Sequence, residues 1–159
     1  MVVSDASPLI NLARVEQFEL LAAFYGQVII PPAVYDEVVV QGQGREGSVE
    51  IQNASWIDVC EPQDDLAVRV LAAELGMGEA SAIILAQERQ AALLLIDEIR
   101  GRRVAQQLGL KVLGTLGILA RAKREGRIPS LRQILDLLRA RGTWIGEELC
   151  EEVLRFVGE

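Results

Sequence analysis

Short apolar stretches alternate with amphipathic segments along the first ~125 residues of the chain. Each stretch has only three or four residues, mostly valine, isoleucine or leucine, which is typical of strands buried on both faces of a parallel sheet. The predicted strands are residues 2–4, 28–30, 56–59, 93–96 and 111–113. The predicted helices are about residues 8–13, 15–24, 33–39, 64–75, 79–90, 100–109 and 115–124. This alternation predicts an α/β fold with a parallel, doubly wound sheet.

The pattern changes after about residue 125, where two amphipathic helices, about 130–140 and 146–157, follow without a strand between them. No interdomain linker separates them from the preceding segment. We therefore expect one domain over residues 1–159, with a core of about 1–125 and a helical extension of about 126–159 packed on it.

A glycine-rich segment, GQGREG at residues 42–47, matches the G-x-G-x-x-G pattern of dinucleotide-binding loops. Its context is poor, because Pro31-Pro32 and the following AVYDEVV favour a helix running into the loop instead of a strand. A flexible loop is therefore expected. A helix directly before Gly42 would exclude the dinucleotide site.

Composition narrows the chemistry that the protein can perform. The chain has no histidine, which excludes Ser-His-Asp triads, Cys-His pairs and histidine metal ligands. A net charge of -7 argues against a protein that coats nucleic acid with a basic surface. The widely spaced Cys60 and Cys150, and the lack of a signal peptide or membrane span, predict a soluble, reduced, cytoplasmic protein.

Two carboxylates follow predicted strands directly. Asp5 follows residues 2–4 and Asp97 follows residues 93–96, and the carboxyl ends of parallel strands are where open α/β sheets bind ligands. Either aspartate could instead be the first polar residue of a turn or a helix cap. Ser7 and Pro8 look like the N-cap and first residue of the next helix, and Thr115 like the cap of a later one.

Two glutamates occupy unusual positions on predicted helices. Glu37 falls between Val34 and Val38 on the apolar face, and Glu79 lies in the first turn of its helix, where the helix dipole alone would also favour it. If these residues meet Asp5 and Asp97, their mutual repulsion requires a cation, and oxygen ligands select Mg²⁺ or Mn²⁺. Metal-dependent phosphodiester hydrolysis is therefore a hypothesis that needs no histidine.

Four ordered motifs, VVSDASPLINLA, PPAVYDEVV, GMGEASAIILAQE and LLLIDEIRGRRVAQQLGLKVLGTLGIL, resemble the PIN-domain family and most closely its VapC-like toxin subgroup. The resemblance implies a three-layer α/β/α fold with a central parallel sheet, which the C-terminal helix pair completes. It also implies an Mg²⁺- or Mn²⁺-dependent endoribonuclease, the toxin of a toxin–antitoxin pair. RNA as substrate, a small antitoxin and a homodimer are the implied partners, without a membrane.

Carried over by motif, the family's catalytic acids fall on Asp5, Glu37, Glu79 and Asp97. Of these, Asp5, Glu79 and Asp97 would bind the metal and Glu37 would complete the pocket. The third acid is commonly Asp in the wider family, so Glu79 changes the reach of that ligand. Glu98 is expected to face solvent.

Ser7, Arg100, Arg103 and Thr115 are candidates for substrate binding. The arginines could hold phosphates, or form a solvated helix face with Arg100 in an ion pair to the carboxylates. An alternative function is a catalytically weak module that binds nucleic acid or protein through the apolar faces of its last two helices.

Overall fold

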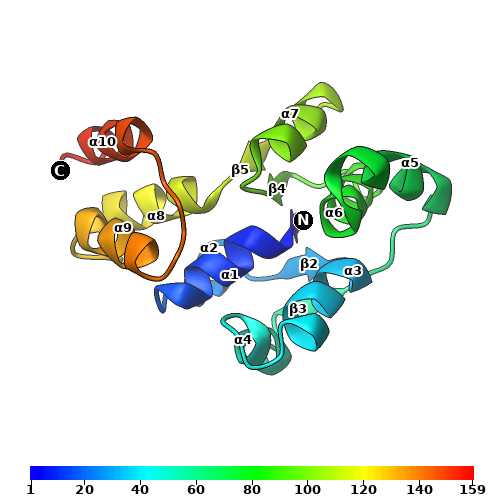
Figure 1. Ribbon diagram of the computed structural model, residues 1–159, viewed down its shortest axis with the longest axis horizontal. Coiled ribbons are helices and arrows are strands. Elements are labelled where there is room, and N and C mark those ends of the chain that lie inside the picture. The colour runs from blue at the N-terminus through cyan, green and yellow to red at the C-terminus, as the bar shows by residue number, and fades with distance from the viewer.

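The computed structural model describes residues 1–159 and contains a five-stranded sheet in which every pairing is parallel, in the order β3-β2-β1-β4-β5 (Figure 1). The strands are β1 (Val2–Ser4), β2 (Val28–Ile30), β3 (Ile57–Val59), β4 (Leu93–Leu95) and β5 (Val112–Leu113). In register, Val3 pairs with Ile29 on one side and with Leu94 on the other. The predicted parallel, doubly wound sheet is confirmed.

Helices cover both faces of the sheet, which gives the predicted three-layer α/β/α fold. They are α1 (Ala6–Arg14), α2 (Leu20–Tyr25), α3 (Pro32–Tyr35), the π-helix η1 (Asp36–Gln41), α4 (Ser48–Asn53), α5 (Asp65–Leu75), α6 (Met77–Glu88), α7 (Ile99–Gln107), α8 (Thr115–Arg124), α9 (Leu131–Ala140) and α10 (Glu147–Phe156). None of them is long and apolar enough to cross a membrane.

Alternate residues of each strand pack against different helical layers, because successive side chains of a strand point to opposite faces of the sheet. Val3 and Leu94 pack with α6 and α7, whereas Val2 and Leu95 pack with α1, α2, α8 and the C-terminal helices. Figure 1 shows α8, α9 and α10 gathered beside α1 and α2, and α5, α6 and α7 together elsewhere. The extension expected after about residue 125 is therefore part of one helical layer.

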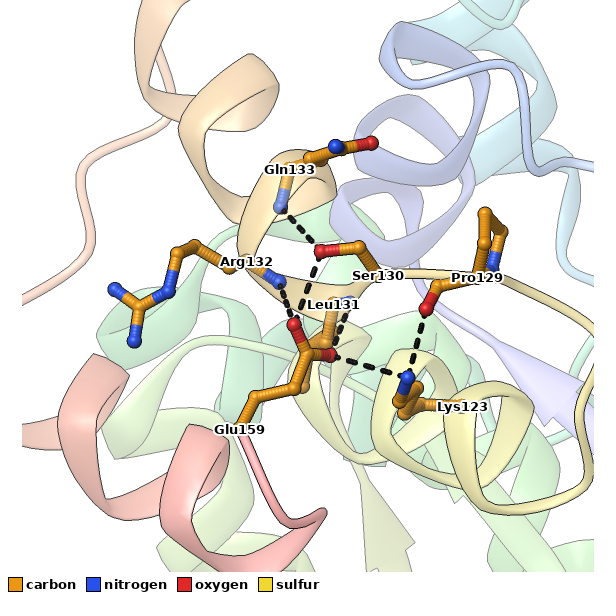
Figure 2. A network of polar contacts seen from close by, with 7 residues as sticks. All are labelled: Lys123, Pro129, Ser130, Leu131, Arg132, Gln133 and Glu159. Atoms are coloured by element: carbon orange, nitrogen blue, oxygen red, sulfur yellow. Dashed lines mark hydrogen bonds and ion pairs between the residues drawn. The ribbon is translucent and has the colours of Figure 1, made fainter.

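The last residue of the chain joins the C-terminal helices to each other (Figure 2). The Glu159 carboxylate accepts hydrogen bonds from the N–H of Leu131 at 2.5 Å and the hydroxyl of Ser130 at 2.9 Å, at the N-terminus of α9. It also pairs with Lys123 Nζ of α8 at 3.7 Å. A carboxylate at this position satisfies helix N–H groups that have no partner within the helix and interacts favourably with the helix dipole.

Several local predictions were wrong at element ends. Asp5, not Ser7, is the N-cap of α1, and Gly114, not Thr115, is the N-cap of α8. The second predicted helix is shorter, since residues 15–19 precede α2. The helical segment η1 runs directly into Gly42, which excludes the dinucleotide site at residues 42–47.

Candidate functional site

The sheet order places the site at the centre of the molecule. β1 and β4 are neighbours in space, yet the chain leaves β1 toward β2 on one side and β4 toward β5 on the other. This is a topological switch point, where the loops after the two strands diverge and leave room for a ligand. Asp5 follows β1 and Asp97 follows β4, so both residues lie at this crevice as predicted.

Asp5 is a buried carboxylate with only 3% of its surface exposed. Its backbone N–H donates to Leu95 O at 2.9 Å, which fixes the end of β1 against β4. The pKa of Asp5 is raised to about 7: burial is the main cause, the N–H of Ala6 lowers it, and the charges of Glu79, Glu37 and Asp97 add smaller increases. The three other acids predicted for the site therefore all act on Asp5 through space.

Glu37 reaches the site from η1. The residue is exposed as a whole, so its predicted place on the buried helix face was wrong; the π-helical turn departs from the spacing on which that prediction rested. Its side chain nevertheless extends toward Asp5. Both carboxylates lie beside Gly78: a Cβ added to that glycine would be 3.3 Å from Glu37 Oε2 and 3.7 Å from Asp5 Oδ1. Partial burial raises the pKa of Glu37.

Glu79 lies in the first turn of α6 and is half-buried. Its Oε2 is fully buried and has no hydrogen-bond partner, and it packs against Gly101 of α7, where a Cβ would collide with it. Burial raises the pKa of Glu79, as do the charges of Glu98 and Glu37, and the charge of Arg100 lowers it. An unpartnered buried carboxylate oxygen is costly and calls for a cation or a proton.

One cavity of about 210 Å³ brings these groups together. Its charged and hydroxyl lining comes from Asp5, Ser7, Glu37, Glu79 and Glu98. Three of the four predicted catalytic acids thus share a cavity with the predicted hydroxyl residue. Glu98 is exposed, as expected, but it also belongs to this lining.

Asp97 faces a neighbouring cavity of about 460 Å³, to which Ser7 and Glu98 also belong. Its Oδ1 accepts from the N–H of Thr115 at 2.6 Å, and its Oδ2 accepts from the Thr115 hydroxyl at 2.7 Å. Thr115 therefore orients Asp97, which goes beyond the capping role that the sequence suggested for it.

Asn11 was missed by the sequence analysis. It is 9% exposed and donates from Nδ2 to Asp97 Oδ2 at 3.0 Å. A signal existed, because Asn11 is an amide within the otherwise apolar run of α1 and lies one turn after Ser7. A buried polar residue at that spacing indicates a hydrogen-bond partner at the sheet edge.

The arginines of α7 stand at the rim. Arg100 and Arg103 are exposed, and none of the ion pairs in the structure involves them, so the expected ion pair of Arg100 with the carboxylates does not form. Arg102 is half-buried, and it lies near Asp97 because both side chains flank Gly114. A Cβ added to that glycine would be 2.7 Å from Arg102 Nη1 and 2.8 Å from Asp97 Oδ1. Arg102 thus lies near a predicted metal ligand.

The donor set fits a divalent metal ion by its chemistry. The groups at the crevice are carboxylate oxygens, and the unpartnered Glu79 Oε2 and the buried Asp5 both gain from a nearby cation. The carboxylates do not form a preformed coordination shell, because no group of three or more of them is close enough together to hold a metal ion.

Comparison with protein-family models matches residues 1–159 to DUF3368, a family described as a PIN domain. No curated protein matches the chain. PIN domains are generally nucleases that act on nucleic acid and need a divalent metal ion. On the evidence of this match, of the three-layer fold and of the acids at its switch point, the chain belongs to the PIN-domain family.

Proposed function

We propose that this protein is a divalent-metal-dependent endoribonuclease that hydrolyses RNA phosphodiester bonds. The observation that carries the proposal is the unpartnered Oε2 of Glu79 in the same cavity as the buried Asp5. A cluster of carboxylates that forms no ion pair destabilises the fold, and it is retained where it binds a cation. The absence of histidine leaves these carboxylates as the groups able to do the chemistry.

In this proposal Asp5, Glu79 and Asp97 hold Mg²⁺ or Mn²⁺. When bound, the ion lowers the pKa of water and neutralises charge that develops on the phosphate. Thr115 and Asn11 hold the Asp97 carboxylate in one orientation through their hydrogen bonds. Glu37, which is exposed and reaches the cavity from η1, orients the attacking water and accepts its proton at a carboxylate oxygen.

The other chain groups have supporting roles. Ser7 lines both cavities, and its hydroxyl is the group there that can donate to a phosphate oxygen. Arg100 and Arg103, exposed and free of ion pairs, are placed on α7 to meet the RNA backbone. This supply of positive charge offsets the net charge of -7 at the point of contact.

The first test is the substitution Asp5→Asn. We expect it to abolish Mn²⁺-stimulated cleavage of single-stranded RNA, because the buried ligand loses its charge but keeps its shape. The matched control is Asp36→Asn, since Asp36 is exposed beside Glu37 and bonds only to Gln41. Cleavage by Asp5→Asn at the rate of the control, with both variants folded by circular dichroism, would reject the assignment.

A second candidate function is a catalytically weak module that binds a partner. It is favoured by a cavity of about 730 Å³ between α8 and α10, whose rim carries Phe156 at 65% exposure, and by the lack of a preformed metal-binding group. Calorimetric titration with Mn²⁺ separates the two candidates. Absence of binding at millimolar metal favours the module.

The role of a toxin, restrained by a small antitoxin, and a homodimeric state are further parts of the proposal that rest on the resemblance to the VapC-like subgroup. The same 730 Å³ cavity, whose lining combines apolar side chains with Arg121, Arg124, Glu125 and Glu152, is where an amphipathic partner segment would fit. Light scattering of the purified chain tests the dimer.

A further inference from the structure

Trp144 is the most exposed of the large hydrophobic residues of the chain, with 88% of its surface accessible. It lies in the loop of residues 142–146, between α9 and α10. An indole in water forgoes the stabilisation that its burial would give. A tryptophan held in this way in a well-anchored loop is typical of a contact residue, because aromatic side chains give large contact area at low entropic cost.

The loop is anchored on both sides of Trp144. The next residue, Ile145, is 9% exposed, and its carbonyl accepts from Arg139 Nη2 at 2.9 Å. The preceding residue, Thr143, donates from its hydroxyl to Asn11 Oδ1 at 2.9 Å and accepts from Arg14 Nη1 at 3.0 Å. The indole is therefore presented on a fixed backbone.

These hydrogen bonds connect the loop directly to the acidic site. Asn11 accepts from Thr143 through Oδ1 and donates through Nδ2 to Asp97, so one amide side chain links the two. The Trp144 loop comes from the C-terminal extension, whereas Asn11 belongs to α1 and Asp97 follows β4. The position of the loop backbone that carries Trp144 is thus tied to the site by a short chain of hydrogen bonds.

Trp144 also shares a cavity with the site. It lines the cavity of about 460 Å³ together with Asp97, and the exposed Ile99 and Leu149 add further apolar surface. Because Ser7 and Glu98 line both this cavity and the smaller acidic one, the two cavities adjoin. The volume lies within the range of about 300–1,000 Å³ that is usual for small-molecule sites.

We propose that the cavity beside Trp144 is a subsite for one unpaired nucleobase of single-stranded RNA, which stacks on the indole when the adjacent phosphodiester lies at the acidic cavity. The inference rests on the proposed ribonuclease function. A nucleobase has apolar faces and a polar edge, which match an apolar-walled cavity containing carboxylates. Unpaired bases stack on aromatic side chains in proteins that bind single strands, whereas bases in a duplex are already stacked on their neighbours and cannot offer a face.

The first experiment uses Trp144 as its own reporter. The chain has two tryptophans, so Trp56→Phe leaves Trp144 as the only one. Trp56 packs on Phe18 with ring centroids 5.1 Å apart, and phenylalanine preserves an aromatic contact there. Rapid mixing of this variant with a ten-nucleotide single-stranded RNA of mixed sequence, in Mg²⁺ and before cleavage proceeds, is expected to quench the indole fluorescence.

Two further probes give the specificity of that signal. A duplex of the same sequence and a ribose-phosphate oligomer without bases are both expected to leave the fluorescence unchanged. Quenching by the oligomer without bases would show that phosphate proximity, not stacking, causes the signal, and would overturn the proposal. Unchanged fluorescence with saturating single-stranded RNA would overturn it as well.

The second experiment measures cleavage by Trp144→Ala, Trp144→Phe and the control Leu66→Ala, whose exposed side chain on α5 lines neither cavity of the site. We expect Trp144→Ala to raise KM for single-stranded RNA by roughly 5- to 100-fold with little change in kcat, and Trp144→Phe to keep most of the affinity. An unchanged KM rejects the subsite. So does a change of oligomeric state by light scattering with unchanged RNA binding, which would assign the loop to a protein contact.

The two proposals fail in different ways. If the wild-type protein cleaves no RNA, the ribonuclease function is rejected, and the fluorescence titration still reports on the base subsite. If cleavage occurs and the indole stays unquenched, only the subsite is rejected.

Discussion

At the scale of single residues, the site is built from groups that weaken the fold when no cation is present. Asp5 is buried with a pKa near 7. Burial also raises the pKa values of Glu37 and Glu79, and like charges raise that of Glu79 further. Each of these acids is easier to ionise in the unfolded chain than in the folded protein. Ionisation of the site therefore opposes folding.

This leads to a prediction for the metal-free protein. Because the pKa of Asp5 rises from 3.8 unfolded to about 7 folded, the folded state binds more protons between these values, so the free energy of unfolding falls as pH rises through that window. In EDTA, wild type should be less stable at pH 8 than at pH 5.5, by an amount of the order of a few kcal/mol. Urea unfolding at the two pH values measures it.

The variant Asp5→Asn tests whether Asp5 causes this dependence of the free energy of unfolding on pH, called the pH slope below. Without the titrating carboxyl, the variant should depend less on pH and exceed wild type in stability at pH 8. Asp36→Asn, at an exposed position, should keep the slope of wild type. Equal slopes for all three proteins would mean that Asp5 does not titrate in this range.

At the scale of elements, the sequence pattern was informative where burial alone decides structure. Residues 28–30 form β2 as predicted, because a short β-branched run between turn residues has few alternatives. The position of Asp5 and Asp97 at the carboxyl ends of their strands followed from the same pattern of short apolar runs. Spacing could not reveal η1, since a π-helical turn depends on tertiary contacts, and this misplaced Glu37. Nor could it show that residues 142–146 would meet Asn11, which lies far away in sequence.

The junction of α8, α9 and α10 gives an element-scale prediction. Glu159 accepts two backbone N–H groups at the start of α9, and these bonds help to lower its pKa. Glu159→Ala should destabilise the protein by about 1 kcal/mol and speed amide exchange in α9 and α10 first. The exposed Glu151 of α10 provides the control, Glu151→Ala.

Protonation should act like the Glu159 substitution. A depressed pKa means that the cap is present at neutral pH and is lost only as pH falls through the folded pKa, below the ordinary value of 4.5. Hydrogen exchange that remains equal in Glu159→Ala and Glu151→Ala would assign the stability of the junction to apolar packing instead.

At the scale of the whole molecule, the acids come from segments that are far apart in the chain and meet because of the strand order. The acids come from the residue after β1, from η1, from the start of α6 and from the loop after β4, and the unfolded chain does not hold them near one another. A divalent ion that binds this group binds only the folded state. Mass action then makes the ion a stabiliser of the entire fold.

Mn²⁺ should therefore raise the Tm of the wild-type protein in proportion to the logarithm of its concentration. At 100 times Kd the gain is about 2.7 kcal/mol, or roughly 5–10 °C for a chain of this size. The shift should be larger at pH 8 than at pH 6, because Asp5 must lose its proton to bind the ion. Glu79→Gln should remove most of the Mn²⁺-induced increase in Tm, because it removes the charge of the buried Glu79 carboxylate. Asp36→Asn should show the same increase as wild type. NaCl of equal ionic strength is the control for screening, and a Tm that does not respond to millimolar Mn²⁺ would favour the partner-binding module over the nuclease.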